Sequence, residues 1–258
     1  MSARTGSVIV RALQLLDTFT PEHPGLTLTE LARRSGFPLT TTHRLVNDLT
    51  TWGALERDPD GRYRIGLRLW ETASLAPRGL GLRELALPFL EDLSQVTQEN
   101  VQLAVRDELD VVYVERIAGR SAIPVLTRVG GRFPMPPTGV GLVLLAHAPT
   151  EIQEEVLAAP LPRFTEKTIV SPRQLRQILA EVRRTGVAIS DRQVTMDAVS
   201  VAAPVHGPGE SVVAAISVVV RAGEVRPNTL IPVVRAAARG ISRTLGTPPP
   251  ARPGSARP

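Results

Sequence analysis

Residues 27–65 read TLTELARRSGFPLTTTHRLVNDLTTWGALERDPDGRYRI, and this stretch decides the fold of the N-terminal part of the chain. Thr27 and Glu30 have the spacing of a capping box, in which each side chain satisfies a free backbone N–H at the start of a helix. That helix ends at Ser35-Gly36, because glycine readily adopts the left-handed conformation of a tight turn between helices. Pro38 limits where the next helix begins, and we expect this helix over about residues 40–51.

The segments on either side of these two helices complete a known motif. Residues 54–57 and 62–65 alternate around Asp58-Pro-Asp-Gly61, which is typical of a β-hairpin. Residues 7–19 have helical periodicity, and a Pro/Gly break over residues 21–25 ends that helix. Its predicted apolar face consists of Ile9, Ala12, Leu13, Leu16 and Phe19. Helix, helix, turn, helix and hairpin within about 60 residues make a winged helix-turn-helix.

The rest of the chain predicts an α+β domain around a mainly antiparallel sheet. Residues 67–96 are helical in pattern, and Pro77 and Gly79 divide them into two helices that join near residue 78. Strands are expected over residues 101–105, 111–116, 125–128, 187–191, 200–205 and 212–220, and helices over 141–146, 150–158, 173–185 and 228–245. We therefore expect a DNA-binding domain over 1–66, linker helices over 67–97, an α+β domain over 98–246 and a disordered tail over 247–258.

Composition excludes several classes of protein. With 43% hydrophobic and 21% charged residues, the 258-residue chain has the make-up of a soluble globular protein. It has no cysteine, so disulfides and thiolate chemistry are excluded. No apolar run of about 18 residues occurs, so no membrane partner is expected, and without a signal peptide the chain is expected in the cytoplasm. Through Leu75 nine arginines face eight carboxylates, so any basic surface depends on where the arginines lie.

Several segments, taken in order along the chain, resemble one family of regulators. They are Ser7-Val-Ile-Val-Arg-Ala-Leu13, Leu31-Ala-Arg-Arg-Ser-Gly36, Thr40-Thr-Thr-His-Arg-Leu45, Gly53-Ala-Leu55, Gly131-Arg-Phe-Pro134, Thr138-Gly-Val-Gly141, Leu144-Leu-Ala146, Gly186-Val-Ala-Ile-Ser-Asp191 and Ser200-Val-Ala-Ala-Pro-Val205. These segments resemble the IclR family, the isocitrate lyase regulator type of bacterial transcriptional regulators. The resemblance implies a GAF-like effector-binding domain, a dimer or a dimer of dimers, and a palindromic DNA operator.

The predicted DNA-binding residues lie on the second helix of the motif and in the hairpin. Thr40 and Thr41 begin that helix, where hydroxyls and free N–H groups bind phosphate. Arg44 is the candidate for base recognition, since a guanidinium can contact guanine O6 and N7 together. The alternative is that these are only solvated polar residues of an amphipathic helix. The full predicted set is Thr40, Thr41, His43, Arg44, Asn47, Arg62 and Arg64.

A small-molecule site is expected in the C-terminal domain. Residues 133–143 form a glycine-punctuated loop that enters a helix, whose backbone N–H groups can hold a carboxylate. The resemblance implies that Gly139, Val140, Ser200 and Ser217 contact the effector, and it aligns Ser190 with a frequent acidic contact. The full predicted set is Phe133, Gly139, Val140, Leu142, Ser190, Asp191, Ser200, Ser217 and Val219.

The character of that site suggests the class of effector. Leu142 stands where the family often has lysine, and Ser200 where it often has cysteine. Together with Leu142, the apolar side chains of Phe133, Val143 and Val219 predict a site suited to an aromatic or medium-sized organic acid rather than a two-carbon acid. Effector binding would shift the population between two arrangements, and the sequence allows either relief of repression or activation.

Two other classes of function were weighed against a regulator. Catalysis would need a constellation such as Ser200, Asp191 and His206, but their spacing does not support a triad. The histidines His23, His43, His147 and His206 form no metal-ligand pair at helical spacing, so neither a metal nor a cofactor is expected. An architectural DNA-binding protein without a ligand is the third alternative, and it would need no pocket.

Overall fold

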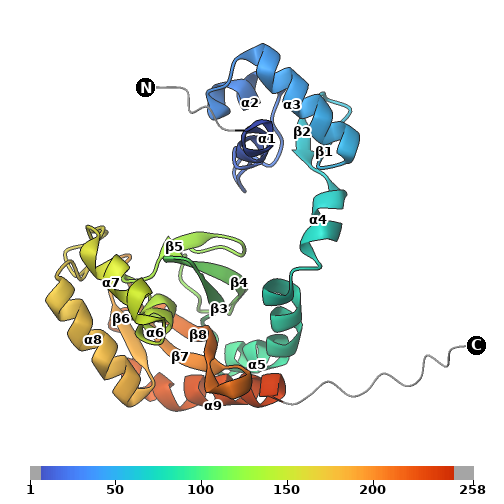
Figure 1. Cartoon of the computed structure of the whole chain (residues 1–258). Coiled ribbons are helices and arrows are strands. Elements are labelled where there is room, and N and C mark those ends of the chain that lie inside the picture. The colour runs from blue at the N-terminus through green and yellow to red at the C-terminus, as the bar shows by residue number, and fades with distance from the viewer. Residues whose placement is uncertain (1–6, 247–258) are drawn as a thin grey trace, which may run out of the picture. The chain divides into compact units, whose positions relative to one another are not determined.

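The computed structural model describes residues 7–246 and divides the chain into two compact units that meet between Ala76 and Pro77 (Figure 1). The tail predicted over residues 247–258 lies outside the described residues. The boundary falls inside the segment 67–97 that the sequence suggested as a linker. Its first helix therefore belongs to the N-terminal unit and its second helix to the C-terminal unit.

The N-terminal unit has the element order of a winged helix-turn-helix, as predicted. Its elements are α1 (Val8–Leu16), α2 (Leu28–Ser35), α3 (Leu39–Trp52), β1 (Leu55–Arg57), β2 (Tyr63–Ile65) and α4 (Leu67–Ala73). The side chains of the buried core are Leu15, Leu26, Leu31, Leu45, Val46, Leu55 and Tyr63. Every helix of the motif contributes to this core, so burial of apolar surface fixes their mutual packing.

Local interactions predicted from the sequence set the ends of α2. The Thr27 amide donates to Glu30 Oε2 over 2.8 Å and the Glu30 amide donates to Thr27 Oγ1 over 3.3 Å, so both halves of the capping box form. These hydrogen bonds from Thr27 lower the pKa of Glu30. At the other end of α2, Gly36 has a φ of 72°, the left-handed conformation that the tight turn requires. The hairpin is held to the start of α2 by an antiparallel bridge between Leu26 and Tyr63.

The predicted apolar face of α1 is only partly correct. Leu15, which the prediction omitted, is fully buried, and Ala12, Leu16 and Phe19 pack around it. Ile9 and Leu13, which were predicted to be buried, are 72% and 54% exposed. The helix reads VIVRALQLL and is apolar on most sides, so periodicity alone could not decide which side faces the core.

The C-terminal unit is an α+β domain, as predicted. After a π-helical turn at Pro77–Gly81, its elements are α5 (Leu82–Thr97), β3 (Asn100–Asp107), β4 (Asp110–Ala118), β5 (Arg132–Pro134), α6 (Gly139–Ala146), α7 (Thr150–Ala158), α8 (Pro172–Thr185), β6 (Ala188–Asp191), β7 (Ala198–His206), a 3₁₀ turn at Pro208–Glu210, β8 (Val212–Arg221) and α9 (Pro227–Gly246). The sheet has six strands in the order β5-β4-β3-β8-β7-β6. All neighbouring strands are antiparallel.

Helices cover both faces of this sheet (Figure 1). Leu103, Val201 and Val218 face α5 and α9, and are fully buried in one apolar cluster with residues of both helices. The opposite face packs against α6 and α8 through a second cluster that includes Ala202 and Ala215. Successive residues of a strand point to opposite faces, so β7 and β8 each supply both layers. The start of α6 is thereby held against the sheet.

One predicted strand is wrong. Residues 125–128 belong to the loop between β4 and β5 and pair with no strand among the described residues. Pro124 cannot donate a backbone hydrogen bond, and the turn at Gly130-Gly131 delays pairing until Arg132. The loop is attached by side chains of β3 instead: Asn100 Nδ2 donates to the Ile123 carbonyl oxygen over 2.8 Å. Val125 and Leu126 line a cavity instead of pairing as a strand, and Leu126 stays 66% exposed.

Candidate functional site

The exposed face of α3 carries the polar residues that the sequence suggested for DNA binding. Thr40, His43, Arg44 and Asn47 are exposed, and Thr41 is half-buried. The side chains of His43, Arg44 and Asn47 make no hydrogen bond or ion pair with any residue in the described range 7–246. The other side of the helix holds Thr42, Leu45 and Val46 in the core. A guanidinium, an imidazole and an amide are thus available on one open surface.

The two hairpin arginines differ from Arg44 because they already have partners within the unit. Arg62 donates from Nη1 to the Gly25 carbonyl oxygen over 3.0 Å and lies 3.5 Å from Glu30 Oε2. Arg64 Nη2 lies 3.1 Å from Asp58 Oδ2. Both side chains remain 46% or more exposed, so they can exchange these carboxylates for phosphate. Arg62 thus ties the hairpin to α2 and the segment before it, whereas Arg64 pairs within the hairpin.

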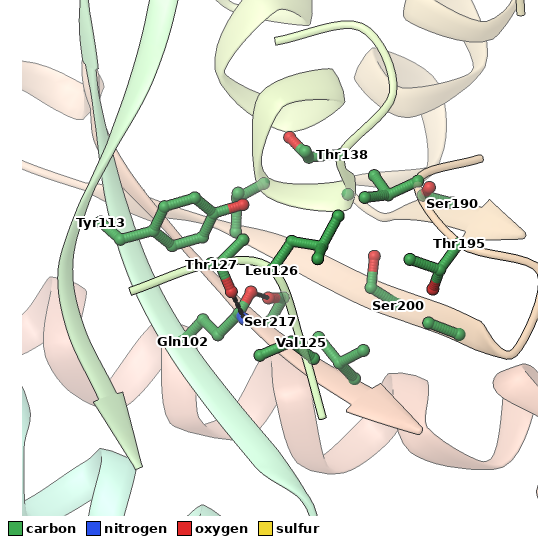
Figure 2. A pocket seen from close by; sticks show the side chains of 15 residues that line it. Gln102, Tyr113, Val125, Leu126, Thr127, Thr138, Ser190, Thr195, Ser200 and Ser217 are labelled. Carbon is green, nitrogen blue, oxygen red and sulfur yellow. Dashed lines mark hydrogen bonds between the residues drawn. The ribbon is translucent and has the colours of Figure 1, made fainter. Parts of the chain in front are cut away.

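A cavity lies in the C-terminal unit between the sheet, the N-terminus of α6 and two loops (Figure 2). Its lining residues are Gln102, Tyr113, Val125, Leu126, Thr127, Thr138, Gly139, Val140, Ser190, Val194, Thr195, Ala198, Ser200, Ser217 and Val219. None of these carries a charge. The space open to the centre of a water molecule is about 50 Å³.

Six of the nine residues predicted for the effector line this cavity. They are Gly139, Val140, Ser190, Ser200, Ser217 and Val219. Alternation along the strands explains why two of them come together: Ser217 and Val219 are two residues apart on β8 and point to one face. Ser200 stands opposite Val219 in the β7–β8 register and opposite Ser190 in the β6–β7 register.

The other three predicted residues lie elsewhere. Phe133 stacks on Phe164 with ring centroids 5.0 Å apart, outside the cavity lining. Leu142 is fully buried in the cluster between α6 and the sheet, because one helical turn carries it away from the N-terminus. Asp191 is exposed and paired with Arg192 over 2.7 Å; hydrogen bonds from Arg192 lower the pKa of Asp191. The cavity is apolar in its middle nevertheless, through Val125, Val140, Val194 and Val219.

The end of the cavity nearest α6, which we call the α6 end, presents hydrogen-bond donors. Gly139 and Val140 are the first residues of α6, so their amides have no acceptor within the helix. Thr138 Oγ1 caps the next amide, that of Gly141, over 3.0 Å. Ser190 Oγ donates to the Pro137 carbonyl oxygen over 2.7 Å and holds the turn that precedes the helix.

Ser200 is packed against this helix start. A Cβ added at Gly139 would lie 2.5 Å from Ser200 Oγ and 3.3 Å from Ala202 Cβ, so only glycine leaves room for the Ser200 hydroxyl in this orientation. The helix dipole adds a partial positive charge where the two free amides and the Ser200 hydroxyl converge. The α6 end is therefore suited to an anionic group although no cationic side chain lines it.

At the opposite end of the cavity, which we call the Gln102 end, three polar side chains form a hydrogen-bonded network. Gln102 Nε2 donates to Thr127 Oγ1 over 2.6 Å, and Ser217 Oγ donates to Gln102 Oε1 over 3.4 Å. Figure 2 shows this group beside the Tyr113 ring. Burial raises the pKa of Tyr113, against the smaller lowering effect of a hydrogen bond with Thr138, so its hydroxyl stays neutral at physiological pH. This end offers uncharged donors and acceptors.

Nine lining residues are absent from the predicted set, and one of them, Thr138, lies in the segment 133–143 that was expected to form the site. Five of them come from loops: Val125, Leu126 and Thr127 before β5, and Val194 and Thr195 before β7. No local pattern indicates which loop side chains fold inward. Gln102 and Tyr113 lie on β3 and β4, and their role depends on long-range strand pairing. Ala198 could have been found, because it lies two residues before Ser200 on the same strand.

Comparison with known proteins identifies the family. The model of the IclR helix-turn-helix domain matches residues 8–59. The model of the bacterial transcriptional regulator IclR C-terminal domain matches residues 76–243. This chain belongs to the IclR family. It is thus a DNA-binding transcriptional regulator with an effector-binding C-terminal domain, as the sequence suggested.

Relatives of this IclR regulator align over nearly their whole length. The HTH-type transcriptional regulator KipR of Bacillus subtilis is 32% identical over 242 residues, covering 92% of this chain and 96% of KipR. XynR of Escherichia coli is 29% identical, covering 93% and 97%. An IclR homolog from Microbacterium hydrocarbonoxydans, whose structure was solved in complex with 4-hydroxybenzoate, is 36% identical with a TM-score of 0.88, covering 93% of this chain and 99% of that one.

Across residues 7–246, no helix has both the length and the apolar character needed to span a bilayer. In the same range, no three His, Asp or Glu side chains gather as a metal-binding group.

Proposed function

We propose that this IclR regulator senses a small aromatic carboxylic acid that binds in the cavity of the C-terminal unit. The observation that carries the proposal is an uncharged cavity lined mainly by apolar surface, with hydrogen-bond donors at the α6 end. The bound 4-hydroxybenzoate in the homolog that is 36% identical supports the same class of effector. An architectural DNA-binding protein would need no such cavity.

The carboxylate of the effector is assigned to the α6 end. The amides of Gly139 and Val140 and the hydroxyl of Ser200 would donate to its oxygens, and the helix dipole would favour its charge. The ring would then lie among Val125, Val194 and Val219. This arrangement stabilises an anion without a buried cation, which avoids the cost of desolvating an ion pair.

The open face of α3 is assigned to the DNA major groove. Arg44 is the proposed base-reading residue, with His43 and Asn47 beside it and Thr40 and Thr41 on phosphate. Arg62 and Arg64 of the hairpin would contact the flanking backbone or minor groove after leaving their carboxylate partners. Effector binding would change operator affinity by a coupling of about 1–3 kcal/mol, a 5–150-fold effect.

A homodimer, alone or paired as a dimer of dimers, is the proposed assembly. In the N-terminal unit, Val8, Ile9, Val10 and Leu13 of α1 are all at least 44% exposed. On α4, Leu67 and Trp70 are 64% and 58% exposed. Contiguous exposed apolar residues of this kind mark association surfaces, and a two-fold dimer suits a palindromic operator.

The proposed role is regulatory rather than catalytic, and the proposed compartment is the cytoplasm, where operator DNA lies. Ser200 and His206 lie on one strand, six residues and therefore roughly 20 Å apart, too far for a proton transfer. His206 Nδ1 instead contacts the Glu210 carbonyl oxygen at 3.0 Å. Repression is supported as the output by relatives named as repressors in Escherichia coli and Salmonella typhimurium, which are 28% and 27% identical.

Isothermal titration calorimetry on the full chain tests the proposed effector class. We expect 4-hydroxybenzoate to bind with a negative heat-capacity change, because the ring is buried among apolar side chains. Glyoxylate serves as the two-carbon comparison and should bind more weakly, since it leaves the apolar middle of the cavity unfilled. Tight binding of glyoxylate with no binding of any aromatic acid would overturn the proposal.

A further inference from the structure

The Gln102 end of the cavity contains hydrogen-bonding groups that the protein does not satisfy by itself. A glutamine amide has two N–H donors and an oxygen with two acceptor sites. Of these, Gln102 uses one donor on Thr127 Oγ1 and one acceptor site for the Ser217 hydroxyl, at 2.6 and 3.4 Å. The side chains of Gln102 and Ser217 are buried, with exposed fractions of 3% and 1%. Bulk water therefore does not satisfy the remaining donor and acceptor.

The network of Gln102, Thr127 and Ser217 can both donate and accept hydrogen bonds, and this limits which ligand groups bind there. Within residues 7–246 the Thr127 hydroxyl accepts from Gln102 and has no acceptor for its own proton. A carboxylate offers only acceptors, whereas a hydroxyl group offers one donor and two acceptor sites. A ligand hydroxyl can therefore accept from Gln102 or Thr127 and donate to Ser217 or Gln102. A second charged group would be buried without a counter-charge, which is costly.

The geometry of the cavity places this network opposite the anion-binding end. Thr138 and Ser200 lie toward α6, while Gln102, Thr127 and Ser217 lie together away from it (Figure 2). Val219 pairs with Ser200 across β7 and β8 and stands two residues from Ser217 on β8, so an apolar side chain lies between the two polar ends. A single ring carrying a carboxylate at one position and a hydroxyl at the far position matches this order of groups.

We infer that Gln102, Thr127 and Ser217 form a specificity site that recognises a phenolic hydroxyl on the effector ring, opposite its carboxylate. This inference rests on the proposed function and adds to it the group that distinguishes one aromatic acid from another. A site built to hydrogen-bond a hydroxyl rejects the analogue that lacks it, because its own buried groups are then left unpaired. The effector class is a para-hydroxylated benzoate rather than an unsubstituted or dicarboxylic one.

Calorimetry with three ligands tests the inference on the full-length wild-type chain. The ligands are 4-hydroxybenzoate, benzoate and terephthalate, which carry a hydroxyl, a hydrogen and a second carboxylate at the same ring position. We expect benzoate to bind about 5–150-fold more weakly than 4-hydroxybenzoate, as expected for one unpaired buried polar group. Terephthalate should bind more weakly than benzoate. Equal affinity for 4-hydroxybenzoate and benzoate would overturn the inference and leave the proposed function standing, whereas no binding of any of the three overturns both.

Variants then assign the recognition to the named residues. Gln102→Leu and Thr127→Val each keep the side-chain size, and both should lower the preference for 4-hydroxybenzoate over benzoate to within about threefold. Thr127 lies half-buried in a loop, so its variant tests the idea even if Gln102→Leu lowers stability. Gln177→Leu makes the same chemical change on the exposed face of α8 and should keep the wild-type preference. An unchanged preference in both cavity variants contradicts the assignment.

Discussion

The exposed face of α3 and the cavity of the C-terminal unit are proposed to recognise their ligands by opposite physical means. On α3, the Arg44 side chain is exposed and has no hydrogen-bond or ion-pair partner among residues 7–246, so its charge is available to a polyanion. The cavity has no charged lining residue and relies on oriented amides and hydroxyls in a buried space. The difference predicts that DNA binding depends on Coulomb attraction through solvent, whereas effector binding depends on shape and on hydrogen bonds shielded from solvent.

The largest expected difference between the two regions is in salt dependence. Raising salt from 50 to 200 mM should lower operator affinity by about 10³-fold if a dimer neutralises six phosphates. The dissociation constant of 4-hydroxybenzoate should change by less than about twofold, because no ion pair with the protein forms. Fluorescence anisotropy and calorimetry in the same two buffers measure both. A steep salt dependence of effector binding would reveal a cationic contact that the account lacks.

A single methyl group at the α6 end should abolish most effector binding. Gly139→Ala brings a Cβ to 2.5 Å from Ser200 Oγ, and relief of that clash costs about 1–3 kcal/mol, up to about 150-fold in affinity. Gly81→Ala is the matched control, since a Cβ there meets no atom within 4 Å. The double variant Gly139→Ala, Ser200→Ala should regain thermal stability but not full affinity. Wild-type effector affinity in Gly139→Ala would contradict the proposed anion site.

Removing one side chain from the open face of α3 should lower operator affinity and leave effector affinity unchanged. Arg44→Ala should cost about 1–3 kcal/mol in operator binding and relax base preference at one position, because its guanidinium is proposed to contact a base edge. Effector affinity measured by calorimetry should stay unchanged. Arg173→Ala removes an exposed arginine of α8 and should leave the footprint intact. Arg64→Ala should cost less than Arg44→Ala, since Arg64 must first leave Asp58. An unchanged affinity and footprint in Arg44→Ala removes it from the base-reading residues.

The smallest predicted effect concerns stability of the N-terminal unit. Thr27→Ala removes the cap of α2 and should cost about 1 kcal/mol in the free energy of unfolding. The Thr27 hydrogen bonds lower the pKa of Glu30, so their contribution is present above the unfolded pKa and is lost as pH falls through the folded one. Urea titrations at pH 7 and below about pH 4 should therefore show that Thr27→Ala lowers the free energy of unfolding less in acid than at neutral pH. Thr51→Ala, at an exposed site on α3, serves as control.

These two regions also differ in how much the sequence reveals. The winged helix-turn-helix follows from local rules, because the Thr27 cap, the Gly36 turn and the hairpin turn each act within a few residues. The cavity depends on contacts far apart in sequence: Ser217 meets Gln102 across 115 residues. Two loop segments complete it, and one of them was predicted as a strand. Leu142 and Phe133 were two of the residues from which an apolar site was predicted, but neither lines the cavity.

The central claim is that one ligand in the cavity controls the affinity of the α3 face for an operator. A gel-shift titration of the wild-type chain and Gly139→Ala against DNA from upstream of its own gene, with nonspecific competitor and with or without 4-hydroxybenzoate, tests this claim most directly. We predict a discrete complex that survives competitor for both proteins, and a 5–150-fold change in operator affinity on adding effector to the wild type only. Smeared, salt-sensitive binding that no single-ring acid alters would contradict the account.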